Sequence, residues 1–472
     1  MTVASLADTF TAALGPGQVL ADPRACAAFA VHGAVPALVV APASIEELQA
    51  ALRLAAERRI AVVPWGGGTQ QWIGAPLASP RPAAGEDGDR ETGRQGDEAV
   101  DRESISVSPP RPRSLPSPPA FAVLRTARLD RVLIYEPDDL TISVEAGMTL
   151  GALRERLAHH GQMLPLDPPL PAHATIGGLI ATAADGPRRL GYGTLRDLLI
   201  GISVVEIGGR RTKAGGMVVK NVSGFDMMKL YLGSFGTLAV VASANFKLLP
   251  APRAAGSLLC RFESAAAAWA FLDALHATQL APSAAEYLNG PALAEVLAPP
   301  AAPDGAQAAI AVRAEGLPAA VERHLRDIGG LARAHGADAQ DVPDDGALWA
   351  RIADLPQTAE LADGEAVVKL TALPSDTATL IAAVERLAAA RGIAATVTAR
   401  ALNGVIYARL RPVAAADLEA LAGATPGLQW VATRVDGGPR WGAPPGLELM
   451  RRIKAEFDPL GLLNPGRFLA GL

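Results

Sequence analysis

The chain has 472 residues, half of them hydrophobic, with 4% aromatic and 19% charged residues and a formal net charge of −5. This length accommodates two or three domains with sizeable cores. The acidic balance and the few aromatic side chains exclude the basic, stacking surfaces typical of nucleic-acid binding, so we expect no nucleic-acid partner.

Cysteine usage and hydropathy restrict the compartment. The two cysteines, Cys26 and Cys260, are far apart in sequence and cannot build a four-cysteine iron–sulfur cluster within this chain. So few cysteines suit a reducing compartment. The N-terminus has no basic region and carries Asp8, which is untypical of a signal peptide, and no run of eighteen apolar residues could span a membrane. The sequence therefore predicts a cytoplasmic protein with no membrane-spanning segment.

The first elements in chain order are a strand, a helix over 45–59 and a second strand that ends in three glycines at 66–68, in "VVPWGGGTQQWIG". A Rossmann motif needs a third glycine and a following helix, and both are absent here. The loop also lacks the G-K-[ST] of a phosphate-binding Walker loop. Unhindered backbone N–H groups from Gly66 to Gln70 form either an anion nest for a pyrophosphate or a plain tight turn.

Residues 79–119 are rich in proline and in charges of both signs and contain almost no large apolar residues. This composition predicts a disordered surface insertion. An alternating strand at 141–146 and a helix that ends at Gly161 follow. The next glycine cluster, with small residues at 181–184, suits a narrow slot for a large planar heteroaromatic ligand. Alternatively, these glycines and alanines simply pack a helix against a sheet.

The composition of the sequence changes after Pro252. Alanine-rich helices at 317–335 and 375–391 alternate with short strands such as "AAIAVRAEG", "GEAVVKLTAL", "VIYARL" and "LQWVATRV". Two similar strand–helix–strand units predict a ferredoxin-like sheet that is covered by helices on one face. The chain ends in a helix and an "NPG" turn, and the predicted fold class is α+β.

Catalytic motifs are scarce. None of the seven histidines forms an H-x-H or H-E-x-x-H pair, and no G-x-S-x-G elbow occurs. We therefore predict no metal site, and the sequence identifies no catalytic side chain. The residues indicate a backbone that cradles a cofactor, with little acid–base machinery.

Several stretches resemble the FAD-linked oxidases, the family with the FAD domain of p-cresol methylhydroxylase and vanillyl-alcohol oxidase. They are "PWGGGT", "GQMLPLDPP", "ADGPRRLGYGTLRDLLIG", "GGMVVKNVSGFDMMKLYLGSFGTLAV" and "NPGRF". The resemblance implies a two-subdomain FAD-binding domain over 1–252 and a ferredoxin-like α+β cap over 253–445. It also implies that residues 446–472 form a helix and an NPG turn that returns to the FAD domain.

The resemblance also implies which residues bind FAD. The glycine loop would hold the pyrophosphate, the second cluster would border the flavin and the ribityl chain, and the last turn would approach the flavin. The first loop has no histidine, so we expect FAD to be non-covalent. The implied FAD-binding residues are Gly66, Gly67, Gly68, Thr69, Gln70, Pro168, Thr175, Gly177, Gly178, Thr182, Gly186, Gly193, Asp197, Gly236, Asn464 and Arg467.

The most specific stretches are similar to the FAD-binding subunit of glycolate oxidases. This similarity implies oxidation of a small 2-hydroxy acid, glycolate, to glyoxylate, with electrons passed through flavin to an iron–sulfur subunit. The implied partners are that subunit and a larger flavoprotein subunit, and the complex could hold the chain peripherally at the inner membrane. Two alternatives stay open: a free-standing FAD-dependent 2-hydroxy-acid or alditol oxidoreductase, and a scaffold without flavin.

Self-sufficient relatives carry a late histidine-rich motif that binds metal and substrate, whereas this chain has no histidine after His335. This absence favours oxidation mainly on the partner subunit. Lys220 and Arg467 are the candidates for binding a carboxylate. Lys220 and Asp226 could face a substrate, a partner or each other in an ion pair.

Overall fold

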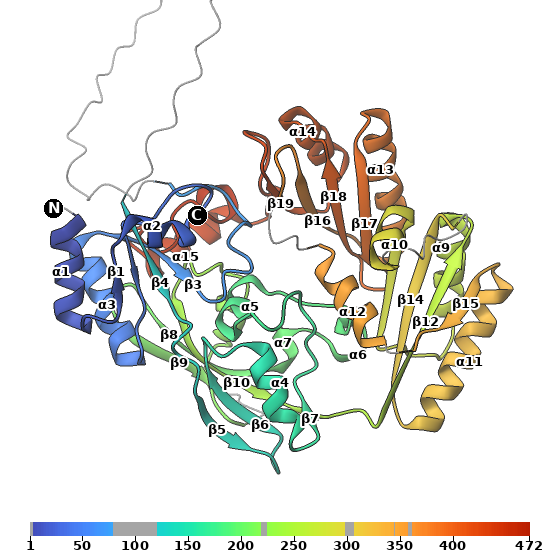
Figure 1. The fold of residues 1–472 in the computed structure, drawn as a ribbon, viewed down its shortest axis with the longest axis horizontal. Coiled ribbons are helices and arrows are strands. Elements are labelled where there is room, and N and C mark those ends of the chain that lie inside the picture. Colours follow the sequence, from blue (N-terminus) through green and yellow to red (C-terminus); the bar gives the residue numbers. More distant parts are fainter. Residues whose placement is uncertain (1–2, 79–119, 219–223, 298–305, 344, 357–360) are drawn as a thin grey trace, which may run out of the picture.

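The computed structural model describes residues 3–78, 120–218, 224–297, 306–343, 345–356 and 361–472. The predicted insertion at 79–119 and Lys220 lie outside the described residues. Figure 1 shows an N-terminal region of two small subdomains and, beside it, a cap built around one large sheet. None of the described helices is both long and apolar enough to cross a membrane.

The first subdomain is a sheet in the order β1-β2-β4-β3, in which β2, β4 and β3 run parallel. Helix α3 begins where the Ser44 side chain accepts a hydrogen bond from the N–H of Glu47, and it buries Leu48 and Leu52 in the core shared with the sheet. The elements are α1 Val3–Leu14, β1 Val19–Leu20, α2 Pro23–Cys26, β2 Leu38–Val40, α3 Ile45–Arg58, β3 Ala61–Trp65 and β4 Phe121–Arg125.

The second subdomain is an antiparallel sheet in the order β5-β6-β10-β8-β9. Two helices, α4 and α5, bury their leucines and isoleucines against Ile142, Val144 and Phe246. The elements are β5 Val132–Glu136, β6 Thr141–Glu145, α4 Leu150–Ala158, β7 Gln162–Met163, α5 Ile176–Thr182, α6 Arg189–Tyr192, α7 Leu195–Leu198, β8 Leu199–Val205, β9 Arg211–Gly215, α8 Met228–Tyr231, β10 Val240–Lys247 and β11 Leu249–Pro250.

The cap contains one antiparallel sheet in the order β15-β12-β14-β13-β17-β18-β16-β19. The predicted strands and the helices α11 and α13 are present at nearly the predicted bounds. The elements are β12 Ala254–Phe262, α9 Ala265–His276, β13 Ala284–Asn289, α10 Gly290–Leu297, β14 Ala308–Gly316, α11 Pro318–Ala334, β15 Asp338–Asp341, α12 Asp345–Asp354, β16 Ala366–Thr371, α13 Thr377–Ala390, β17 Ala394–Arg400, β18 Val405–Arg411, α14 Ala415–Ala424 and β19 Leu428–Thr433.

Helices cover both faces of the cap sheet, so the prediction of a single covered face is incomplete. The helices α9, α11, α13 and α14 pack on one face around a large core. On the other face, α10 and α12 cover part of the sheet with an apolar cluster that includes Leu293 and Trp349. Figure 1 shows α12 on the side of the sheet that faces the N-terminal region.

A row of polar and aromatic side chains crosses the rest of that second face. Cross-strand pairing places Glu286 of β13 opposite Arg400 of β17, and Lys369 of β16 opposite both Tyr407 of β18 and Trp430 of β19. Arg400 and Tyr407 share this face because Thr398, two residues before Arg400, pairs with Tyr407. Five neighbouring strands, β13, β17, β18, β16 and β19, thus bring these groups together on one face.

After the cap, the chain returns to the N-terminal region through α15 Leu447–Phe457, as Figure 1 shows. Leu463 then forms a parallel bridge with Val62 of β3. The buried carboxylate of Asp458 holds this turn, because it accepts hydrogen bonds from the N–H groups of Leu462 and Leu463 and from Lys454 Nζ, at 2.6–3.0 Å. Asp458 thus fixes the turn by which the C-terminal segment reaches β3.

We predict that Asp458→Ala lowers the free energy of unfolding by about 3–5 kcal/mol, because it removes the carboxylate that pairs with the largely buried Lys454 ammonium and accepts from two buried N–H groups. Denaturant titration measures this loss. The matched control is Glu448→Ala on the same helix, whose pair with Arg451 is largely exposed and should change stability by about 0.5 kcal/mol or less. Equal losses of unfolding free energy in the two variants would contradict the role of Asp458 in holding this turn.

Candidate functional site

The glycine loop after β3 packs directly on the segment that leads into α5. A Cβ atom on Gly66 would lie 2.0 Å from Thr175 Oγ1, and one on Gly67 would lie 1.8 Å from the carbonyl oxygen of His173. Gly68 has a φ of +77°, in the left-handed region. The loop therefore needs glycine for its packing and its turn, and this packing leaves its backbone bare along one wall of a cavity.

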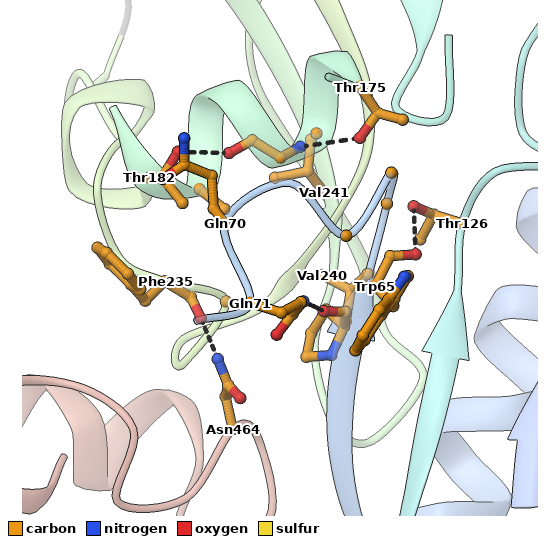
Figure 2. A pocket seen from close by; sticks show the side chains of 18 of the residues that line it. Trp65, Gln70, Gln71, Thr126, Thr175, Thr182, Phe235, Val240, Val241 and Asn464 are labelled. Carbon is orange, nitrogen blue, oxygen red and sulfur yellow. Dashed lines mark hydrogen bonds between the residues drawn. The ribbon is translucent and has the colours of Figure 1, made fainter. Parts of the chain in front are cut away.

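That cavity, drawn in Figure 2, is a cleft between the glycine loop, the start of α5, the turn before β10 and the C-terminal segment. Twelve of the sixteen residues predicted to bind FAD line it. They are Gly66, Gly67, Gly68, Thr69, Gln70, Thr175, Gly177, Gly178, Thr182, Gly236, Asn464 and Arg467. Segments almost 400 residues apart in sequence thus meet around one space.

The other four predicted residues do not line this cavity. Gly193 and Asp197 lie at the start of α7, where the Asp197 carboxylate accepts hydrogen bonds from the N–H and hydroxyl of Thr194. Gly186 packs on the backbone of Asp167, because a Cβ there would lie 1.9 Å from the Asp167 carbonyl oxygen. Pro168 lies one residue before Pro169, which lines a second cavity.

Sequence reasoning missed the apolar side of the cleft. Further lining residues come from both ends of the glycine loop and from neighbouring strands: Pro64, Trp65, Gln71, Thr126, Ala181, Phe235, Ala239, Val240 and Val241. Four of these nine, Trp65, Gln71, Ala181 and Phe235, adjoin a predicted residue in the sequence, so extending each motif by one position would have found them. Thr126 follows β4, and its position depends on the pairing of β4 with β3.

Two polar groups of the C-terminal segment fit an anionic, hydrogen-bonding cofactor in this cleft. Asn464 donates to the carbonyl oxygen of Phe235 at 2.6 Å, while its own Oδ1 has no partner among the described residues. Arg467 is 1% exposed and donates to the carbonyl oxygens of Gln71 and Ile73, yet no carboxylate of the described residues pairs with it. Burial lowers the pKa of Arg467 to about 10, so it stays cationic at neutral pH.

A second cavity adjoins the first, and the two share the lining residues Gln70, Thr182 and Phe235. Its wall on the cap side contains four residues of the cross-strand row, Lys369, Arg400, Tyr407 and Trp430, together with Pro356. On the opposite side, the N-terminal region contributes Trp72, Ile73, Pro169, Ala184 and Asp185. This cavity therefore lies between the cap and the region that holds the first cavity.

Arg400 and Asp185 join the two sides of the second cavity. Arg400 Nη2 lies 3.3 Å from Asp185 Oδ1 and donates to the Asp185 carbonyl oxygen at 3.0 Å, and both side chains are about 95% buried. Burial alone would raise the pKa of Asp185, but Arg400, Lys369 and Arg189 lower it below its usual value. Asp185 is therefore ionised at neutral pH.

Lys369 has no carboxylate partner among the described residues. Its ammonium lies 5.7 Å from the centre of the Tyr407 ring, and the Arg400 guanidinium lies 5.0 Å from the same centre. Arg400 Nε is buried and has no hydrogen-bond partner in the described part of the chain. Two cationic groups with unused donor capacity thus flank one ring, an arrangement that suits a carboxylate ligand.

The other predicted charged groups lie elsewhere. Asp226 pairs with Lys229 at 2.6 Å at a half-exposed position, whereas Lys220 is outside the described residues. Arg467 lines the first cavity rather than the second. No cluster of three or more histidine, cysteine or acidic residues within the described ranges could hold a metal ion.

Comparison with known proteins identifies both parts of the chain. Residues 36–79 and 119–215 match the FAD binding domain model, and residues 251–418 and 439–468 match the C-terminal domain of FAD linked oxidases. Solved structures with the same fold include 4-ethylphenol oxidase from Gulosibacter chungangensis, with a TM-score of 0.71, and p-cresol methylhydroxylase, with a TM-score of 0.70. Each covers 98% of this chain and 96% of its own, at 15% and 14% sequence identity.

Curated relatives include two glycolate oxidase subunits. The chain is 27% identical to subunit GlcD of Bacillus subtilis over 93% of its own length and 90% of that protein. It is 39% identical to subunit GlcE of Escherichia coli over 27% of its length and 37% of that protein. D-lactate dehydrogenase of Anaerostipes hadrus is 30% identical over 35% of each chain.

These matches confirm three predictions. The fold is that of the p-cresol methylhydroxylase type, the cofactor is FAD, and the chain is an FAD-dependent oxidoreductase acting on CH–OH donors. The bare loop, the unpartnered Asn464 oxygen and the buried Arg467 cation fit FAD in the first cavity. The contacts of individual residues with FAD, and its non-covalent binding, stay predictions.

We predict that Gly178→Val reduces the FAD bound per chain about tenfold or more, because a larger side chain overfills the cleft. A Cβ at Gly178 meets only Thr175 Oγ1 within 4 Å, so the cavity receives the added methyl groups. Gly177→Val tests this less cleanly, since its Cβ would lie 2.9 Å from that of Ala146. Flavin absorbance of the purified protein measures occupancy.

The control for this substitution is Gly330→Val in α11, where no atom lies within 4 Å of the added Cβ. It should retain FAD. Full flavin content in Gly178→Val would remove Gly178 from the cofactor wall.

We predict that Glu286→Gln flattens the dependence of stability on pH. Burial raises the pKa of Glu286 from 4.5 to about 8 in the folded chain. The folded state therefore binds the proton more strongly than the unfolded state between these values, so stability falls as pH rises through this window. Thermal unfolding between pH 5 and pH 9 measures the change, with the exposed Glu263→Gln as the control. Parallel curves for wild type and Glu286→Gln would contradict the prediction.

Proposed function

Because the chain belongs to the FAD-linked oxidase family, we propose that it oxidises a short 2-hydroxy acid, glycolate, to glyoxylate as one flavoprotein subunit of a larger complex. The observation that carries this proposal is the second cavity. It shares Gln70, Thr182 and Phe235 with the first cavity. It is also lined by two cationic side chains, Lys369 and Arg400, whose donors are not fully used.

The substrate would bind through its carboxylate. Lys369 supplies an ammonium without a carboxylate partner, and Arg400 supplies the unused Nε–H, so a carboxylate between them forms charge-assisted hydrogen bonds with both. Trp72, Tyr407 and Trp430 fill much of the remaining wall. These bulky rings favour a substrate of two or three carbons and keep water away from it.

Bound FAD supplies the two-electron acceptor for this chemistry. The side chains of the chain bind and orient the substrate so that its hydroxyl-bearing carbon points toward the shared boundary at Thr182 and Phe235. The hydroxyl proton needs an acceptor, and no histidine of the described residues lines the second cavity. Asp185 is the ionised oxygen acceptor on this wall.

The proposal of a complex rests on the relatives that are glycolate oxidase subunits. Two cysteines cannot hold an iron–sulfur cluster within this chain, so electrons would leave the flavin for a partner iron–sulfur subunit. A larger flavoprotein subunit would be the second partner. Co-purification from the native source, with identification of bound chains and flavin, tests this assembly.

The alternative is a free-standing FAD-dependent 2-hydroxy-acid or alditol oxidoreductase. The similarity to GlcD over 90% of that subunit favours oxidation by this chain itself over a relay role. Anaerobic mixing of the isolated FAD-loaded chain with glycolate separates the roles. Bleaching of the flavin indicates oxidation at this subunit, unchanged absorbance indicates a relay, and steady turnover with a soluble acceptor supports the free-standing enzyme.

We predict that Lys369→Met raises the KM for glycolate about 30- to 100-fold, because the substrate carboxylate loses a charged partner in a buried cavity. FAD content should stay at the wild-type level, since Lys369 does not line the first cavity. Steady-state kinetics of the complex measures the effect. Lys213→Met, an exposed lysine of β9, is the control, and an unchanged KM in Lys369→Met would contradict the carboxylate site.

A further inference from the structure

The side chains that line the second cavity carry a net positive charge. Of the described residues that line it, three are charged at neutral pH: Lys369, Arg400 and Asp185. Their sum is one positive charge. Because the cavity is lined otherwise by aromatic, apolar and uncharged polar groups, this charge is poorly screened by water.

Asp185 is held as an anion between two arginines. One oxygen, Oδ1, faces Arg400 Nη2 at 3.3 Å, and the other accepts from Arg189 of α6. The Asp185 side chain is 5% exposed, whereas that of Arg189 is 31% exposed and does not line the cavity. Both arginines therefore hold Asp185 as an anion, and of the two only Arg400 lines the cavity.

A second carboxyl group lies beside Arg400 but does not share this role. Glu286 stands opposite Arg400 in the neighbouring strand and does not line the cavity. Burial, together with the nearby Asp167 and Asp185, raises the pKa of Glu286 to about 8 against the lowering effect of Arg400. It is therefore mostly uncharged at pH 7, and the charge of Arg400 is offset by Asp185.

We propose that Asp185 is a built-in counter-ion that restricts the second cavity to ligands with a single carboxylate. One carboxylate balances the remaining positive charge. A second carboxylate would leave a buried negative charge without a partner, close to that of Asp185, and both the desolvation and the repulsion disfavour it. This inference rests on the proposed function and makes Asp185 the residue that determines specificity for monocarboxylic over dicarboxylic 2-hydroxy acids.

The test compares two ligands that differ by one charge at nearly constant shape: oxamate, a monoanion, and oxalate, a dianion at pH 7. Neither can be oxidised as a 2-hydroxy acid. Calorimetry and the perturbation of the flavin spectrum measure their dissociation constants with the FAD-loaded chain. Asp185→Asn keeps an oxygen toward Arg400 but removes the charge, and it should improve the affinity for oxalate relative to oxamate on the order of tenfold.

The matched control is Glu286→Gln, which replaces an uncharged carboxyl group beside the same arginine and should leave the ratio of the two affinities unchanged. Retained FAD absorbance and a cooperative melt verify that both variants are folded. An unchanged ratio in Asp185→Asn, or an equal change in Glu286→Gln, overturns the counter-ion role while leaving the proposed function intact. If wild type binds neither oxamate nor oxalate, the carboxylate site itself, and with it the proposed function, fails.

Discussion

Both cavities depend on the contact between the C-terminal segment and the glycine loop. Arg467 donates to the carbonyl oxygens of Gln71 and Ile73, Asn464 donates to that of Phe235, and Leu463 pairs with Val62 beside the loop. These bonds fix the loop from the side opposite α5. Without them, neither the FAD cleft nor its boundary with the cap cavity has a second wall.

The sequence was sufficient for features that depend on local patterns. Glycines after a strand marked the loop, the helix expected over 45–59 is α3, and the strands and alanine-rich helices of the cap appear at nearly their predicted bounds. Twelve of the sixteen cofactor residues that the family resemblance implied also line one cleft. The exceptions, such as Gly193 and Asp197, serve local turns and caps that use the same residue types.

The residues of the second cavity could not be predicted from local patterns, because they share no sequence motif. Lys369, Arg400 and Tyr407 are single polar residues within apolar strands, and each looks like an ordinary exposed position. They meet only because β17, β18 and β16 pair in this order, with a register that turns all three to one face. The partner of Arg400, Asp185, comes from the other region of the chain. Strand order and register depend on contacts between residues far apart in the chain, so local patterns in a single sequence do not predict them.

The position of Arg467 also constrains when the protein can become functional during its synthesis. The loop at 66–71 emerges from the ribosome early, but Arg467, which locks it, follows Gln71 by 396 residues. A nascent chain therefore has the bare loop and the first sheet long before it has a closed cofactor cleft. A closed cleft therefore forms only after the cap has been synthesised, and a chain truncated before Asn464 lacks the part of the wall that Asn464 and Arg467 supply.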